Sequence, residues 1–151
     1  MLEDFIESNK INAKFISFTT IMSMESAVLT KKIPSSVAIK IRVFNTLKND
    51  PVLLITRFNA NVDIQKIKEI LLLDDDEDLI ELTSQECVNI TGYKKGFIPP
   101  ISIYGLKIII DSYFEKKEYL FCRVDEKKFL KVPLASIIQT NDDVVFEKIE
   151  L

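Results

Sequence analysis

The chain has 151 residues and a formal net charge of −3, is 47% hydrophobic and 28% charged, and contains no histidine. Its length and composition predict one globular domain over residues 1–151 with a sizeable core. The absence of histidine excludes Ser-His-Asp and Cys-His catalysis and removes the commonest metal ligand. The negative charge argues against a protein that coats long stretches of nucleic acid, but it is compatible with contact to one end of an RNA.

The N-terminus and the cysteines bear on location and cofactors. No apolar run approaches the roughly 20 residues of a membrane span, and Met1–Phe5 lacks the basic-then-apolar layout of a signal peptide. We therefore expect a cytoplasmic protein without membrane contact. Cys87 and Cys122 stand far apart with no Cys-x-x-Cys motif, so each is interpreted as a buried apolar residue, and we expect no metal or other cofactor.

The first part of the chain predicts a helix, a strand and a second helix. Residues 2–11 have an amphipathic pattern with acidic residues in the first turn, and residues 13–19 follow as a strand. Ser23 is positioned to cap a helix that runs through residue 29 and is stopped by Pro34.

The clearest predicted strand covers residues 37–45. Its side chains alternate between two faces, Val37, Ile39, Ile41 and Val43 on one and Ala38, Lys40, Arg42 and Phe44 on the other. A turn at 48–51 leads into a second strand at 52–58, which predicts an antiparallel hairpin. On these residues alone, the two cations are better explained as the wet face of the hairpin than as a binding site.

The second half of the chain alternates helices and strands irregularly. A helix begins near Asp63, an acidic turn at 74–78 precedes a short strand at 79–82, and Thr83 and Glu86 form a capping box for a helix that ends at Gly92. The apolar run 106–111 predicts a strand buried on both faces, 117–124 and 128–132 a second hairpin, Pro133 the first turn of a helix through 139, and 144–149 a last strand. The fold class is therefore α+β with a mixed sheet.

One loop stands out between these elements. All three glycines and two of the five prolines fall within residues 91–105. Glycine permits positive φ or close backbone approach, and Pro99-Pro100 fixes two φ angles and removes two donors, so the loop has a defined shape. Either it carries function, as shaped loops often do, or it is an ordinary long connection.

The order of these parts resembles the YbaK/ProX family of aminoacyl-tRNA editing domains, which are related to the editing domain inserted in bacterial prolyl-tRNA synthetase. The similarity runs over nearly the whole chain, through the helix at Ser23 and the segments 37–43, 61–63, 82–84, 91–93, 96–100, 110–112 and 132–134. It implies a mixed, partly closed β-sheet with helices packed outside.

The resemblance also implies an activity and a site. The family hydrolyses the ester that joins a wrong amino acid to the 3′ end of tRNA, so the expected function is a trans-acting deacylase for substrates such as Cys- or Ala-tRNA(Pro). The expected partners are the acceptor end of the mischarged tRNA and prolyl-tRNA synthetase, with no DNA. By resemblance Lys40 is the catalytic lysine, and the substrate-binding residues are Gly96, Phe97, Ile98, Pro99, Pro100, Ser102, Cys122 and Arg123.

Three positions depart from the family pattern. Ile41 follows the lysine where relatives commonly carry Thr or Ser, Ser102 replaces a small residue, often glycine, and Cys122-Arg123-Val124 replaces a glycine-rich turn. Either Arg123 points into the pocket and binds an anion, or it points outward and Cys122 and Val124 narrow the pocket; the cost of burying an unpaired arginine favours the second. The alternative to a deacylase is a non-catalytic relative that binds tRNA, a nucleotide or a synthetase.

Overall fold

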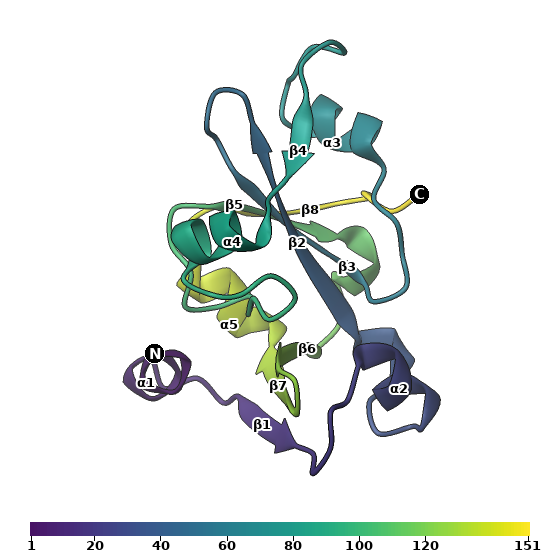
Figure 1. Cartoon of the computed structure of the whole chain (residues 1–151), viewed down its shortest axis with the longest axis vertical. Helices are drawn as coiled ribbons and strands as arrows, with labels where there is room; N and C mark the ends of the chain where they lie inside the picture. The colour runs from purple at the N-terminus through teal and green to yellow at the C-terminus, as the bar shows by residue number, and fades with distance from the viewer.

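Eight strands form two sheets in the computed structural model, which describes residues 1–151 (Figure 1). The five-stranded sheet has the order β4 (Leu79–Glu81), β2 (Ile39–Thr46), β3 (Val52–Arg57), β5 (Lys107–Asp111), β8 (Val144–Glu147). The three-stranded sheet has the order β1 (Lys14–Ser17), β7 (Lys128–Pro133), β6 (Tyr119–Asp125). The helices are α1 (Leu2–Ser8), α2 (Met24–Leu29), α3 (Ile64–Ile70), α4 (Ser84–Thr91) and α5 (Leu134–Thr140), with 3-10 turns at Ser35–Val37 and Ser112–Phe114. The predicted α+β class is confirmed.

The five-stranded sheet is mixed, as predicted. Strand β2 pairs antiparallel with β3 and β4, whereas β5 runs parallel to both β3 and β8. The β2–β3 hairpin is confirmed, with Lys40 opposite Thr56 and Arg42 opposite Leu54. Strand β5 is buried on both faces, because Ile108 and Ile110 belong to the main core while Ile109 packs in a separate cluster with Ile67 of α3.

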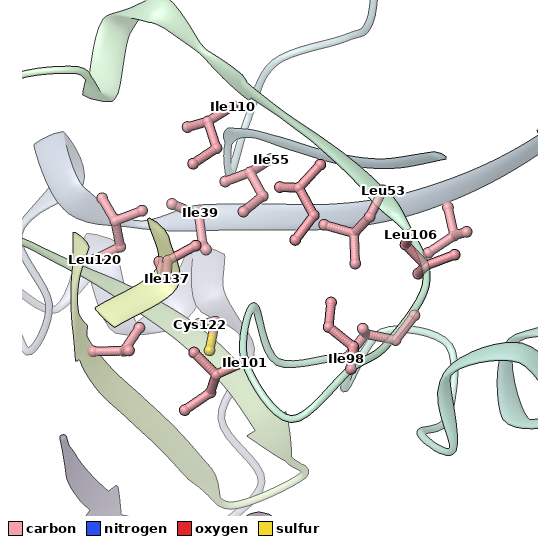
Figure 2. Close-up of a cluster of buried hydrophobic side chains, with 14 of the residues drawn as sticks. Ile39, Leu53, Ile55, Ile98, Ile101, Leu106, Ile110, Leu120, Cys122 and Ile137 are labelled. Carbon is pink, nitrogen blue, oxygen red and sulfur yellow. The ribbon is translucent and has the colours of Figure 1, made fainter. Parts of the chain in front are cut away.

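Both faces of the β2–β3 hairpin are covered for much of their length, which corrects the expectation of one wet face. On one side, Figure 2 shows Ile39, Leu53 and Ile55 facing Leu120 and Cys122 across the main core. On the other side, Phe44 lies in the cluster under α3, which the strand alternation could not reveal because the pattern does not say which helix returns to that face. Only the start of this second face, where Lys40 is exposed, remains open.

The two sheets meet at a single parallel bridge between Ala38 and Phe121. Around this contact, α2 packs its buried Met24 and Ala27 in a cluster with Phe121. In Figure 1, α2 lies beside the lower end of β2, and β6 and β7 lie to the left of that end. The predicted partly closed sheet is thus realised as two sheets that touch once and then diverge, and the wedge between β2 and β6 holds the site described below.

Local chemistry explains where the helices begin. Ser23 Oγ accepts from the N–H of Ser26 at 3.1 Å, and Asp63 Oδ1 accepts from the N–H of Lys66 at 3.2 Å. Thr83 and Glu86 form the predicted capping box. Pro133 differs from the prediction: it ends β7 and occupies the N-cap of α5 with φ −63° and ψ 136°, so it precedes the first turn rather than forming it. No helix combines the length and apolarity needed to cross a membrane.

Candidate functional site

A cavity of about 530 Å³ fills the wedge between the two sheets. Its longest wall is Ile39–Val43 of β2. The other walls come from α2, α4, β6 and the loop of residues 91–105, here called the glycine loop. These walls contribute Glu25, Cys87, Gly96, Ile98, Cys122 and Arg123. Segments that lie up to 100 residues apart in the sequence therefore meet around one space.

The cavity is more positive than the molecule as a whole. Lys40, Arg42, Lys95 and Arg123 line it, against two carboxylates, Glu25 and Glu81. A concave wall lined by one sign of charge concentrates the potential, so this space favours an anionic ligand although the net charge of the chain is −3.

Glu81 pairs with two of the four cations and offsets one of their two charges. Its carboxylate accepts from Arg42 at 2.7 Å (Nη2 to Oε1) and 3.1 Å (Nε to Oε2), and Lys95 Nζ lies 3.8 Å from Oε2. The hydrogen bond from Arg42 lowers the pKa of Glu81 and outweighs the opposing effect of burial; the charges of Arg42, Lys95 and Lys40 lower it further. Glu81 is therefore ionised at neutral pH and is a poor general acid.

Lys40 and Arg123 are the cations of the cavity that make no ion pair with a carboxylate. Lys40 is exposed, and no carboxylate oxygen lies within 4.0 Å of its Nζ. The Arg123 guanidinium lies 5.0 Å from the centre of the Phe97 ring, and its Nη2 donates to the carbonyl of Glu126 at 3.2 Å. Its Nε is buried without a hydrogen-bond partner. Lys40 is therefore free to bind an anion, whereas Arg123 is held in place by Phe97 and the Glu126 carbonyl.

The glycine loop reaches the cavity through only part of its length. Gly96, at φ +90°, and Ile98 line it, whereas Phe97 lies on the far side of Arg123 and borders a second depression. Pro99 and Pro100 are buried and do not line the cavity. In this structure they lie behind the lining, where they fix the shape of the loop, and their part in substrate binding stays a prediction.

Ser102 also lies behind the lining. It is buried, takes φ +63°, and its Oγ accepts from the Tyr93 hydroxyl at 2.8 Å. Burial raises the pKa of Tyr93 although this hydrogen bond opposes the shift. At the other end of the loop, Lys95 Nζ donates to the Leu82 carbonyl at 2.9 Å. The loop is therefore fixed to itself and to the end of β4, which keeps Gly96 and Ile98 in place.

The segment Cys122-Arg123-Val124 lies on β6, where the pairing with β7 shifts register between Arg123 and Asp125. Cys122 is buried in the main core and lines the cavity together with Arg123. Val124 packs against the core and borders the second depression, so only Cys122 of the two expected apolar residues lies in the cavity wall. Burial raises the pKa of Cys122 to about 12 and also raises the pKa of Cys87. Neither thiol is therefore available as a thiolate nucleophile at neutral pH.

Sequence reasoning missed two members of the site. Glu81 and Lys95 were assigned no role, yet they organise the charges of the cavity. Glu81 reaches Arg42 because β4 pairs with β2 rather than with β3, which precedes it in the chain. The acidic residue on the short strand 79–82 indicates a partner for Arg42 only once the strand order is known. No group of three His, Cys, Asp or Glu side chains comes close enough to hold a metal ion.

Fold and site together define an α+β domain with a cation-lined cavity between two sheets, built without histidine. The chain belongs to the family of aminoacyl-tRNA editing domains, whose model matches residues 19–136. The resemblance to the YbaK/ProX editing domains is thereby confirmed. The matched range contains every residue that lines the cavity. No curated protein matches the sequence.

Solved structures share the fold at low sequence identity. The crystal structure of a "hypothetical protein APE2540" superposes with a TM-score of 0.83 at 13% identity, covering 99% of both chains. A "putative trans-editing enzyme for prolyl tRNA synthetase" gives a TM-score of 0.82 at 13% identity, covering 99% of this chain and 94% of the other. A longer "putative signal transduction protein" from Marinobacter aquaeolei matches 99% of this chain with 30% of its own length, at a TM-score of 0.69 and 13% identity.

Proposed function

We propose that the protein is a trans-acting aminoacyl-tRNA deacylase that hydrolyses the ester of a mischarged tRNA, of the Cys- or Ala-tRNA(Pro) type. The observation that carries the proposal is the unpaired Lys40, which lines the same positive cavity as Gly96 in a chain of the editing family. The whole chain would act as one editing domain in the cytoplasm, with the acceptor end of the tRNA as its ligand and prolyl-tRNA synthetase as a candidate partner.

The proposed mechanism is electrostatic and positional. Lys40 holds a phosphate or another oxygen of the tRNA end, and main-chain N–H groups near Gly96 orient the ester carbonyl and stabilise the negative charge that develops on it. The raised pKa values of both thiols and the pairing of Glu81 make these three groups poor nucleophiles. In this mechanism the nucleophile is a positioned water or a group of the substrate, and neither metal nor cofactor is needed.

Deacylation of a panel of mischarged tRNAs, beginning with Cys- and Ala-tRNA(Pro), tests this function. We expect Lys40→Ala to lower the rate by about 100-fold or more and to change the free energy of unfolding by less than about 0.5 kcal/mol, because Lys40 is exposed and unpaired. Lys40→Arg should also be impaired, since a flat guanidinium does not replace a compact ammonium. Lys48→Ala, in the exposed turn after β2, is the matched control and should leave the rate unchanged.

Two results would overturn the proposal in different ways. Wild-type turnover in Lys40→Ala would remove Lys40 from the mechanism. Tight binding of aminoacylated tRNA with no hydrolysis of any member of the panel would instead identify a non-catalytic relative that binds tRNA.

A further inference from the structure

The edge of β2 that borders the cavity has no neighbouring strand at Ile41. Strand β4 pairs with β2 only at Phe44, Asn45 and Thr46, and its last contact is the Leu82 N–H, which donates to the Val43 carbonyl at 2.9 Å. From Val43 back towards the start of β2, the cavity borders this edge in place of a continued β4.

The register of the sheet fixes the direction of the Ile41 main chain. Alternate residues of an antiparallel strand direct both N–H and C=O to the same edge. The Val43 carbonyl points to the β4 side, and the Ala38 carbonyl, which accepts from Phe58 N–H at 3.0 Å, points to the β3 side. Ile41 lies two residues before Val43 and therefore points its main-chain groups to the same edge. Its N–H and C=O are directed away from β3, towards the cavity that Ile41 lines.

The side chain of Ile41 holds this edge in position. It lies on the same face as Ile39 and Val43 and packs against the main core. The main-chain donor and acceptor are therefore presented by a rigid strand paired with β3 on its other side. Polar main-chain groups at a protected edge normally acquire a partner, from protein, water or ligand.

The chemistry of an aminoacyl group matches this pair of groups. In a hydrogen-bonded antiparallel pair, one residue exchanges both bonds with one residue opposite, N–H to C=O and C=O to N–H. An aminoacyl ester has the same N–Cα–C=O skeleton as one residue, with an α-ammonium that donates and a carbonyl oxygen that accepts. A bound amino acid can therefore take the place of one residue of an added strand.

We propose that the Ile41 main chain binds the amino acid of the substrate in this way, its C=O accepting from the α-ammonium and its N–H donating to the ester carbonyl oxygen. This inference rests on the proposed deacylase function and adds the element that recognises the α-amino acid backbone. Recognition through the main chain is independent of the amino acid side chain, which extends instead towards the other cavity walls, where Cys87, Ile98 and Cys122 form the apolar part. Lys40, the residue before Ile41, is left for the oxygens of the nucleotide.

A binding experiment that needs no catalysis tests the inference. The probe is 3′-alanylamino-3′-deoxyadenosine, whose amide link resists hydrolysis, compared with its N-acetyl and its des-amino (propionyl) counterparts. Because the inferred contact includes a charge-assisted hydrogen bond from the α-ammonium, we expect the parent to bind about tenfold or more tightly than either counterpart. In ¹⁵N-isoleucine spectra of the wild-type protein, the Ile41 amide, assigned by its loss in Ile41→Val, should shift and exchange more slowly when the parent binds.

Two variants separate the main chain from the side chain. Ile41→Pro removes the N–H, and the β2–β3 ladder does not use that N–H, so the fold should tolerate a proline at this edge. It should weaken parent binding about tenfold, whereas Ile41→Ala, which keeps the main chain, should change it less than about threefold. If Ile41→Pro fails to fold, the ligand series and the amide spectra on the wild-type protein still decide the question.

The outcomes distinguish this inference from the function on which it rests. Equal binding of the parent and propionyl compounds, an unmoved Ile41 amide, or no binding of the parent at millimolar concentration would each overturn the inference. If mischarged tRNA is nevertheless hydrolysed in a Lys40-dependent manner, the proposed function stands without it.

Discussion

The carboxylate of Glu81 holds two cations of the cavity wall, and Glu81→Gln is the change that tests how much this pairing contributes. The variant keeps the size of the side chain but removes its charge. Hydrogen bonds to charged groups stabilise a fold by about 1.5–3 kcal/mol. The side chains of Arg42 and Glu81 are 21% and 28% exposed, so water screens part of this interaction. We expect a loss of about 1–2 kcal/mol in the free energy of unfolding, and a fall of about 2–8 °C in Tm for a chain of this size.

The loss should depend on pH in a direction set by the lowered pKa of Glu81. A carboxyl group with a depressed folded-state pKa stabilises the fold fully above its unfolded-state value, and this contribution is lost as the pH falls through the folded-state value. The ordinary value is 4.5. The difference between wild type and Glu81→Gln should therefore be complete at pH 7, shrink below pH 4.5, and vanish once the carboxyl is protonated in both states.

Urea unfolding followed by circular dichroism at pH 7, 5 and 3.5 measures the effect. Glu69→Gln on α3 is the matched control, because Glu69 is exposed and makes no ion pair or side-chain hydrogen bond. A double-mutant cycle with Arg42→Gln isolates the pairwise part. A stability difference that is the same at pH 3.5 as at pH 7, or no difference at pH 7, would refute the electrostatic explanation of the Glu81 pairing.

Three further predictions concern the loop, the thiols and the C-terminus. Gly96 has φ +90° and open space where a Cβ would lie, so Gly96→Val should cost about 1–2 kcal/mol in backbone strain. The deacylation rate should fall by more than the fraction of protein that unfolds at the assay temperature, as judged from Tm. A fall equal to that fraction would indicate that the loop is an ordinary connection. Because burial raises the pKa of Cys122 to about 12 and also that of Cys87, neither should react with a disulfide reagent at pH 8 until the protein unfolds, and rapid reaction in the native state would contradict this. Glu150→Gln should lower the free energy of unfolding by about 2–3 kcal/mol, since its side chain is 2% exposed and accepts from the main-chain N–H and Nε of Arg57; an unchanged urea midpoint would be the contrary result.

Local features of the fold could be predicted from the sequence because neighbouring residues determine them. The capping box of Thr83 and Glu86 satisfies N–H groups within one turn, and Gly92 ends the same helix at φ +81°, where other residues are strained. The uninterrupted Ile108–Ile110 run indicated a strand covered on both sides. The family resemblance added the overall arrangement, which periodicity alone does not specify.

The rest of the site depends on strand order, which local patterns do not encode. Glu81 and Arg42 are 39 residues apart and meet only because β4 pairs with the far edge of β2. The same pairing ends after Thr46–Phe44 and leaves Ile41 at an open edge. Alternation correctly separated Ile41 from Lys40, but it could not show that both residues border one cavity, Ile41 while packing its side chain against the core.

The single bridge between the sheets explains why one short strand can serve both the fold and the site. At Ala38 the backbone of β2 is tied to Phe121, so the wedge has a fixed apex. Beyond the apex the sheets diverge, and the gap is too wide for direct strand pairing but narrow enough for Arg123 of β6 and Lys40 of β2 to line one cavity. A closed sheet would have consumed the Ile41 N–H and C=O in its own ladder. Incomplete closure therefore provides the cavity and leaves both main-chain groups free to bind a ligand.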